Sequence, residues 1–166
     1  MTLRVVALAL LLSSGAVAQT PKKTEPAGKP APASFDFKAR MQQIMDGWST
    51  LDPSKAAPFY SQEKDNVFYD VAPMKYVGWA AYAAGVPKVF ADYQSAKLTV
   101  GKDARAHQRG TFAWGTATVH VDLVKKDGAK EPMDARWTVL WQKTGDDWLV
   151  FHEHFSVPLP SPAPKK

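Results

Sequence analysis

The stretch RWTVLWQKTGDDWLVFHEHFS, residues 136–156, consists of two segments of alternating apolar and polar side chains with a turn at 144–147 between them. Alternation with a period of two is typical of β-strands, because successive side chains point to opposite faces of a sheet. The preceding stretch TFAWGTATVHVDLV, residues 111–124, alternates in the same way, and Asp127-Gly128 is a hairpin signal between the two. We therefore predict an antiparallel meander over the second half of the chain.

The first half has the spacing of helices instead. An apolar stripe recurs every three or four residues in FDFKARMQQIMDGW, residues 35–48, which predicts one amphipathic helix. A second, short helix is expected over 53–61, bent at Pro58, and a third over 78–93 with Trp79, Tyr82, Val86, Phe90 and Tyr93 on one face. Residues 66–71 are expected to form a short strand between the second and third helices, and residues 95–100, SAKLTV, an alternating strand after the third helix. Helices followed by long strands predict an α+β fold in which a curved antiparallel sheet wraps three helices and leaves a cone-shaped pocket.

The two ends of the chain have a different composition. Residues 1–18 have a positive start at Arg4, an apolar run and the small residues Ala16-Val17-Ala18, which is typical of a signal peptide cleaved near Gln19. A periplasmic or secreted protein is expected, with a retained N-terminal anchor as the alternative. Residues 19–34 and 159–166 are rich in proline, alanine and lysine and are expected to be disordered. One folded domain, residues 35–158, remains.

Charge and motifs restrict the class of function. The formal net charge is +5, and the end segments account for all of it, so the predicted domain is neutral. A nucleic-acid-binding domain carries its basic charge on the folded surface, so we expect no nucleic-acid partner. No phosphate loop, dinucleotide motif or serine nucleophile arrangement occurs, and we expect no cofactor. The chain has no cysteine.

Three quoted pieces carry a resemblance to a known family: DGWSTLDPSKAAPFYS (46–61), VFYDVAPMKYVGW (67–79) and the opening stretch 136–156. In this order they resemble the SnoaL-like branch of the nuclear-transport-factor-2-like superfamily, over nearly all of residues 35–158. The segment 141–156 is also similar to the end of the calcium/calmodulin-dependent kinase association domain. The resemblance implies the cone-shaped fold. It does not fix the function, because this fold hosts enzymes, binding modules and oligomerisation domains.

The resemblance also implies a role for one aspartate. Steroid isomerases of the superfamily have a catalytic aspartate after the first strand, and Asp70 holds that position within one residue of loop length. Asp70 would remove a proton next to a carbonyl, with its pKa raised by desolvation in the pocket. This chain lacks the isomerases' first-helix tyrosine and has Trp137 near their second aspartate, so Tyr60 or Trp137 would have to donate instead. The alternative is that Asp70 accepts backbone hydrogen bonds from the 72–78 loop.

The last strand raises the question of Glu153. Regular alternation would place Trp148, Val150, His152, His154 and Ser156 on the outer face, and Leu149, Phe151, Glu153, Phe155 and Val157 toward the helices. Glu153 would then be a pocket acid or ligand anchor, or a buried ion pair with Arg136, Arg105 or Arg109. His152 and His154 need a third ligand to hold a metal, with His120 and Asp122 as the candidates, and we expect no metal site.

Two functions are compatible with these observations. The first is an exported protein that binds a small apolar or amphipathic ligand, as a homodimer through an outer sheet face with Trp114, Thr116, Thr118, His120 and Trp148. The second is a cofactor-free isomerase, dehydratase or cyclase in which Asp70 is the general base, aided by Glu153. A pure oligomerisation module is a third. The expected ligand-binding residues are Tyr60, Phe68, Trp79, Tyr82, Trp137, Trp141 and Phe151.

Overall fold

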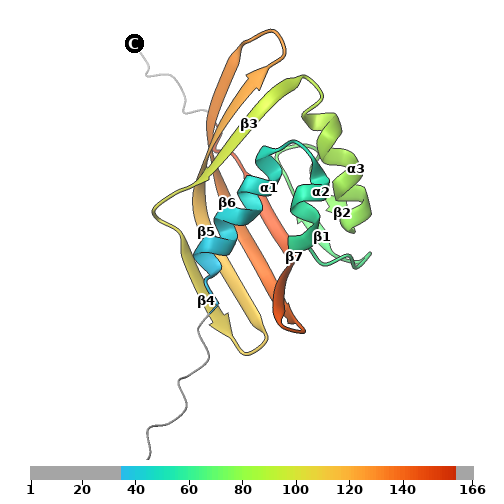
Figure 1. Cartoon of the computed structure of the whole chain (residues 1–166), viewed down its shortest axis with the longest axis vertical. Coiled ribbons are helices and arrows are strands. Elements are labelled where there is room, and N and C mark those ends of the chain that lie inside the picture. Colours follow the sequence, from blue (N-terminus) through green and yellow to red (C-terminus); the bar gives the residue numbers. More distant parts are fainter. Residues whose placement is uncertain (1–34, 160–166) are drawn as a thin grey trace, which may run out of the picture. The chain divides into compact units, whose positions relative to one another are not determined.

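The computed structural model describes residues 35–159, which form an α+β unit (Figure 1). Its helices are α1 (Phe37–Ser49), α2 (Pro53–Ala56) and α3 (Trp79–Val89), and a 3-10 turn, η1 (Ala57–Phe59), follows α2. Its strands are β1 (Val67–Tyr69), β2 (Tyr76–Val77), β3 (Tyr93–Val100), β4 (Arg105–Arg109), β5 (Phe112–Lys125), β6 (Lys130–Thr144) and β7 (Asp147–Ser156). The α+β prediction is confirmed. The predicted signal peptide, the linker and tail residues 160–166 lie outside the described residues.

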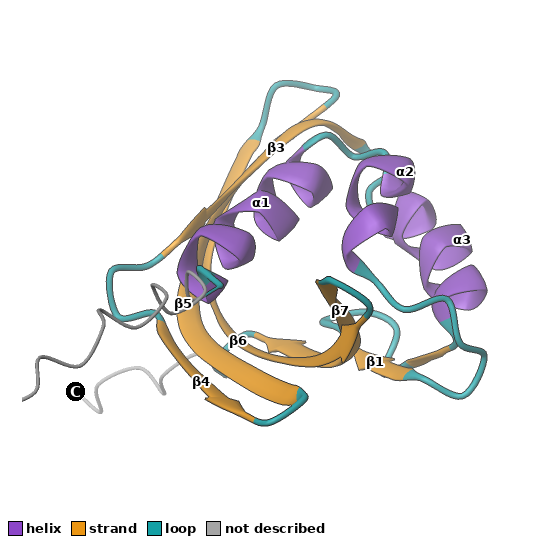
Figure 2. Cartoon of the chain, turned by 60° about the horizontal axis from the view of Figure 1, so that its bottom comes forward, coloured by secondary structure: helices purple, strands orange, loops and turns teal. Residues whose placement is uncertain are grey.

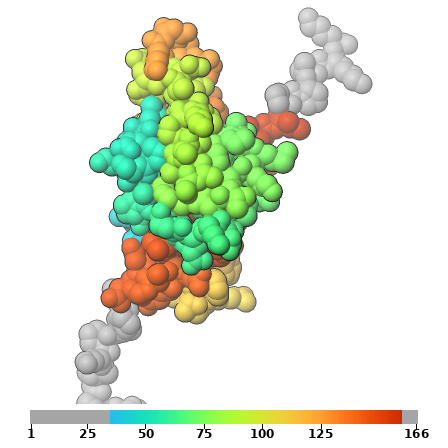
Figure 3. Space-filling view, turned by 90° about the vertical axis from the view of Figure 1, so that its right-hand side faces the viewer, coloured from blue at the N-terminus to red at the C-terminus, as the bar shows by residue number. Residues whose placement is uncertain are grey.

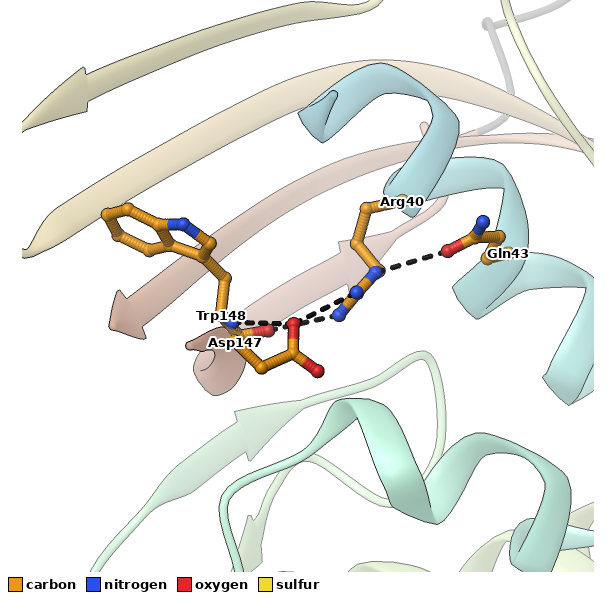
Figure 4. Close-up of polar contacts among 4 residues, drawn as sticks. All are labelled: Arg40, Gln43, Asp147 and Trp148. Atoms are coloured by element: carbon orange, nitrogen blue, oxygen red, sulfur yellow. Dashed lines mark hydrogen bonds and ion pairs between the residues drawn. The ribbon is translucent and has the colours of Figure 1, made fainter. Parts of the chain in front are cut away.

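Helix α1 packs with its apolar stripe toward the sheet. Asp36 caps it by accepting a hydrogen bond of 2.9 Å from the backbone N–H of Ala39. Its buried face consists of Phe37, Met41, Ile44, Met45, Gly47 and Trp48. The Arg40 guanidinium connects this helix to the start of β7, because it donates hydrogen bonds to the Asp147 carboxylate and the Trp148 carbonyl oxygen (Figure 4). None of the helices within residues 35–159 has the length and hydrophobicity needed to span a bilayer.

The second and third helices begin where capping signals stand in the sequence. Asp52 accepts a bond from Ser54 N–H, and Pro53 follows at the first helical position. The predicted helix 53–61 changes into η1 at Ala57 and ends at Phe59, because Pro58 cannot continue an α-helix. Gly78, with φ 77°, precedes α3, and a Cβ there would lie 2.9 Å from the Lys64 carbonyl oxygen. Only glycine therefore suits this position.

The seven-stranded sheet has the order β2-β1-β7-β6-β5-β3, and β4 pairs with β5 beyond that path. The long hairpins β5–β6 and β6–β7 are antiparallel, as predicted. Strand β1, however, pairs with β7 in parallel, so the sheet is mixed rather than purely antiparallel. The short strands β2 and β4 were not predicted, because segments this short carry too few residues to show a period.

The prediction of which side chains in the first half of β7 face the core is wrong, because this strand contains a bulge. Leu140 pairs with His152, and the next residue of β6, Trp141, pairs with Val150, so Phe151 is an extra residue on β7. An extra residue shifts the alternation by one position. Trp148 and Val150 therefore point into the core, not outward as predicted. Glu153, beyond the bulge, faces the helices as predicted.

The strands curve around α1, and α2 and α3 lie across the open side (Figure 2). Seen from that side, the green and yellow-green residues that include α3 occupy the centre of the surface (Figure 3). Between the helices and the sheet lies an aromatic core in which Trp48, Tyr60, Phe68, Trp79 and Tyr82 contact one another. Not all of the space between the helices and the sheet is filled: a cavity is lined by residues of α1, α3, β3 and the sheet strands β5, β6 and β7.

Candidate functional site

A cavity of about 280 Å³ lies between the helices and the concave face of the sheet. Its volume is at the lower end of the range for small-molecule pockets. Its walls are mostly apolar side chains from α1, α3, β3, β5, β6 and the segment after β7. The lining also includes two acidic residues, Asp70 and Glu153, and two tyrosines, Tyr82 and Tyr93. The complete lining is Met45, Trp48, Asp70, Val71, Tyr82, Val86, Val89, Phe90, Tyr93, Leu98, Val121, Leu123, Met133, Glu153, Phe155 and Val157.

Glu153 is the buried acid of this cavity, with 1% of its surface exposed. Its position on β7, between Val139 of β6 and Phe68 of β1, fixes its side chain against the helices. Three neutral donors surround the carboxyl group. The Tyr82 hydroxyl donates to Oε1 at 2.7 Å, Trp137 Nε1 donates to Oε2 at 2.9 Å, and the Tyr60 hydroxyl lies 3.0 Å from both oxygens.

These contacts differ from the ion pair expected with Arg136, Arg105 or Arg109. No arginine or lysine within residues 35–159 forms a salt bridge with Glu153. Burial raises the pKa of Glu153 to about 7, although the hydrogen bonds from Tyr82, Trp137 and Tyr60 oppose the rise. Near neutral pH the group is therefore close to the midpoint of its titration.

Tyr60 and Tyr82 both take part in the hydrogen-bond network around Glu153. Tyr60 accepts a bond of 2.8 Å from Trp48 Nε1 while it donates to Glu153. Burial and the neighbouring Glu153 raise the pKa of both tyrosines well above their ordinary range, so they stay neutral donors. The hypothesis that Tyr60 or Trp137 offers a free donor to a ligand is wrong for this arrangement, because both already donate to Glu153.

Asp70 directly follows β1 and lines the cavity, as the resemblance implied. Its Oδ1 accepts a bond of 2.7 Å from the backbone N–H of Val71, not from the 72–78 loop. Burial raises the pKa of Asp70 to about 6, and only this backbone bond opposes the rise. The group also lines a shallow groove on the outer side, together with Met74 and His154. Asp70 therefore stands between the cavity and the surface.

The other predicted ligand-binding residues lie around the cavity rather than in its wall. Tyr60 and Trp137 do not line the cavity, but they donate hydrogen bonds to Glu153, which does. Phe68 stacks on Tyr82 with ring centroids 5.0 Å apart. Trp79 stacks on Tyr60, and Trp141 packs against Phe37. Phe151 is the bulged residue and contacts Phe112 on the far side of the sheet, so regular alternation placed it wrongly.

Much of the actual lining was visible in the sequence as periodic faces. Tyr82, Val86, Phe90 and Tyr93 belong to the predicted apolar face of the third helix. Leu98, Val121 and Leu123 are on the inward side of alternating strands. These patterns show which side chains point inward, but not which of them pack together and which leave a space.

The two histidines of the last strand play no part in the cavity wall. His152 bonds the Val67 carbonyl oxygen at 2.7 Å through Nδ1, and His154 is exposed beside Tyr69. Strand β6 lies between β7, which carries both histidines, and β5, which carries His120 and Asp122. The four residues considered as a metal site therefore do not form one cluster. No group of three metal-ligating side chains occurs in the described part of the chain.

Comparisons with known proteins agree with this architecture. A family profile described as the SnoaL-like domain matches residues 38–160. None of the curated proteins matches the sequence. Among solved structures, a nuclear transport factor 2-like superfamily protein from Salmonella enterica serovar Typhimurium has a TM-score of 0.66 at 17% identity. The match covers 78% of this chain and 96% of that one.

Two further structures carry more specific descriptions. One, from Xanthomonas campestris, is described as a calcium/calmodulin-dependent protein kinase II association domain, with TM-score 0.65, 19% identity and coverage of 81% of this chain and 95% of that chain. The other, from Streptomyces avermitilis, is described as a dehydratase of the nuclear-transport-factor-2-like family, with TM-score 0.65, 11% identity and coverage of 75% and 95%. At such identities the likeness shows the fold alone. By the match of the family profile over most of its length, the chain belongs to the SnoaL-like domain family.

Proposed function

We propose that this protein binds a small, largely apolar molecule in the cavity between its helices and sheet. The observation that carries the proposal is a cavity of about 280 Å³ with apolar walls and two carboxyl groups. Protein interiors are normally close-packed, and apolar pockets with a few convergent polar groups are the usual binding sites for small molecules. The solved structure described as a dehydratase supports this use of the fold by analogy.

A binding experiment with a matched pair of variants tests the proposal. The neutral fluorescent probe N-phenylnaphthylamine should bind the wild-type protein with increased fluorescence. Val89→Trp should abolish the increase, because Val89 lines the cavity and a tryptophan there would fill it. Val77→Trp is the control, since Val77 is 51% exposed on β2 and does not line the cavity. Equal probe binding by both variants would overturn the proposal.

A second function, proton transfer on the bound molecule, is favoured by the pair of raised pKa values. Asp70 has a pKa of about 6 and Glu153 of about 7, both as a result of burial, and both groups line one cavity. Two carboxyl groups of this kind can serve as base and acid near neutral pH. Asp70 would remove a proton beside a carbonyl, and protonated Glu153 would return one to a carbonyl oxygen or a departing hydroxyl. Such chemistry belongs to isomerases and dehydratases.

Exchange of substrate protons measures that step directly. Enolisable cyclic ketones incubated with the protein in heavy water should lose their α-proton NMR signals faster than in buffer. Asp70→Asn should reduce the rate to that of the buffer, whereas Asp65→Asn, at an exposed surface position, should not change it. If the wild-type protein accelerates α-proton exchange in none of the ketones tested, the proposal of catalysis is overturned and the proposal of ligand binding stands.

The proposal includes export and self-association. Cleavage of residues 1–18 is tested by N-terminal sequencing of the protein from the periplasm or medium, where Gln19 should be first. Association through the outer face of β5 is tested by sedimentation. Thr116→Arg, at an exposed position on that face, should dissociate a dimer, and Gln62→Arg, exposed between η1 and β1, should not. A monomeric wild-type protein would remove the dimer from the proposal.

A further inference from the structure

The two carboxyl groups of the cavity have no cationic partner. Within residues 35–159, neither Asp70 nor Glu153 forms a salt bridge, and no lysine, arginine or histidine lines the cavity. Two lysines on neighbouring segments do not reach the acids either. Lys125 pairs with Glu131, and Lys88 lines a separate hollow beside Tyr76. An apolar cavity with two acids and no base is electrostatically incomplete, because buried charges are normally paired.

The hydrogen bonds around Glu153 favour its ionised form, whereas its burial favours the protonated form. All three of its partners, Tyr60, Tyr82 and Trp137, donate hydrogen bonds to it, and an indole N–H can only donate. A protonated carboxyl group could donate its hydrogen only if one of the two tyrosine hydroxyls accepted it and no longer donated to Glu153. Yet the partners are neutral, so they do not supply the positive charge that would offset the burial of an anion. A cation in the cavity would supply it.

Asp70 offers a second acceptor for the same cation. Its Oδ1 accepts the Val71 N–H, and no second hydrogen bond to this carboxyl group occurs among the described residues. Asp70 lies on the loop after β1, and Glu153 on β7 pairs with Phe68 two residues before it, so the two acids approach one cavity from adjacent strands. Both residues line the same cavity.

We propose that the cavity is selective for lipophilic amines: a protonated amino group is held between Asp70 and Glu153, and its apolar skeleton packs against the side chains of α3, β3 and β5. This inference rests on the proposed binding function and names its ligand class. An ammonium group gains two charge-assisted hydrogen bonds, and the aromatic rings of Trp48 and Tyr82 offer it further favourable contact. An anionic ligand of the same shape is repelled by both carboxylates. A neutral one gains only the apolar contacts.

Three ligands that share one ring system separate these cases. Naphthylmethylamine, naphthylmethanol and naphthoic acid differ only in a head group that is cationic, neutral or anionic near neutral pH. Calorimetric titration of the full chain should show the amine bound at least about tenfold more tightly than the alcohol, with the acid weakest. Asp70→Asn should reduce the ratio of amine to alcohol affinity toward one. Asp65→Asn, with its carboxyl group on the exposed surface, should leave the ratio unchanged.

The wild-type protein alone provides a second readout, which does not depend on the folding of a variant. Binding of the amine requires ionised acids, so its affinity should rise between about pH 5 and about pH 8, with release of protons on binding. The affinity of the alcohol should not rise. The other titratable groups facing the two acids are Tyr60, Tyr76 and Tyr82, all with a raised pKa, and these remain neutral in that range. His154 lines the shallow groove on the outer side of Asp70, and His154→Gln controls for an effect of this residue on the affinity.

The outcomes distinguish this inference from the function on which it rests. Equal affinity for amine and alcohol, or a preference for the acid, overturns amine selectivity and leaves ligand binding in place. Absence of binding by all three ligands while N-phenylnaphthylamine still binds also overturns it. Absence of binding by the three ligands and by the neutral probe overturns the proposed function itself.

Discussion

The hydroxyl of Tyr82 on α3 donates a hydrogen bond of 2.7 Å to Oε1 of Glu153 on β7, 71 residues further along the chain. Both residues line the cavity, so this bond joins the helical layer to the sheet at the wall of the candidate site. It is also the shortest of the hydrogen bonds to the Glu153 carboxyl group. The stability of the fold and the protonation of the site therefore depend on the same contact.

Replacing Tyr82 with phenylalanine should expose this dependence. The variant loses one donor to a buried carboxyl group, and we expect the free energy of unfolding to fall by about 1–3 kcal/mol. The loss should be larger at about pH 8, where Glu153 is ionised, than at about pH 5. Urea unfolding at the two pH values measures both. Tyr69→Phe is the matched control, because Tyr69 on β1 is 38% exposed. A loss that is equal at both pH values would contradict the assigned role.

The pH dependence of stability has a defined sign. The pKa of Glu153 rises on folding from 4.5 to about 7, and that of Asp70 from 3.8 to about 6. Between the unfolded and folded values the native state holds more protons, so the free energy of unfolding should fall as the pH rises from about 4 to about 7. The contribution of Glu153 is on the order of 3 kcal/mol. It is fully present below pH 4.5 and lost as the pH passes 7.

Comparison with Glu153→Gln isolates this contribution from other titrating groups. His120, whose pKa is raised by Asp134, also makes stability fall with pH, but it titrates equally in both proteins. We expect the variant to show a flatter dependence of the urea unfolding free energy over the same range. Parallel curves for wild type and variant would mean that Glu153 is already ionised throughout.

The contact between α1 and β7 gives a prediction about the opposite end of the cone. The Arg40 guanidinium bonds Asp147 at 2.9 Å and the Trp148 carbonyl at 3.3 Å, and its side chain is 13% exposed (Figure 4). Arg40→Met keeps the apolar stem and removes three hydrogen bonds, one of them to Gln43, so it should lower the unfolding free energy by about 1–2 kcal/mol. Lys38→Met, on the exposed face of the same helix, should change it little.

Local sequence patterns predicted most of the fold. Alternation along β5, where Ala117, Val119 and Val121 point inward, and the apolar stripe of α1 both match the structure. Patterns of this kind report which face of an element is buried. They do not report partners. The parallel pairing of β1 with β7 joins segments that are far apart in the sequence, and nothing within either segment specifies it.

The candidate site was predictable only in part, because sequence patterns indicate which side chains face inward but not which of them contact one another. Asp70 and Glu153 both line the cavity, as expected from the resemblance and from the inward face of the last strand. The partners of Glu153 were not arginines but Tyr60, Tyr82 and Trp137, which lie directly after η1, on α3 and on β6. The misplacement of Phe151 arose from a bulge, which alternation alone cannot reveal because it adds a residue without changing the composition of the strand.

Gly115 provides the last prediction, because a side chain of α1 and one of β6 pack closely against it. A Cβ at this position of β5 would lie 2.9 Å from the Trp141 ring and 3.0 Å from the sulfur of Met41. Both neighbours are fully buried, so neither can move aside without disturbing the core. Gly115→Ala should therefore lower the unfolding free energy by about 1–3 kcal/mol, even though alanine suits a strand no worse than glycine.

Urea unfolding of Gly115→Ala alongside Thr116→Ala tests this close packing. Thr116 is the next residue on β5 and points to the exposed outer face, so its replacement should change stability by less than about 0.5 kcal/mol. Because α1 also supplies Met45 and Trp48 to the cavity wall, a shift of the helix away from Gly115 should weaken binding of the neutral probe as well. Unchanged stability in Gly115→Ala would mean that α1 has room to move against the sheet, and that the cavity is not held at a fixed size.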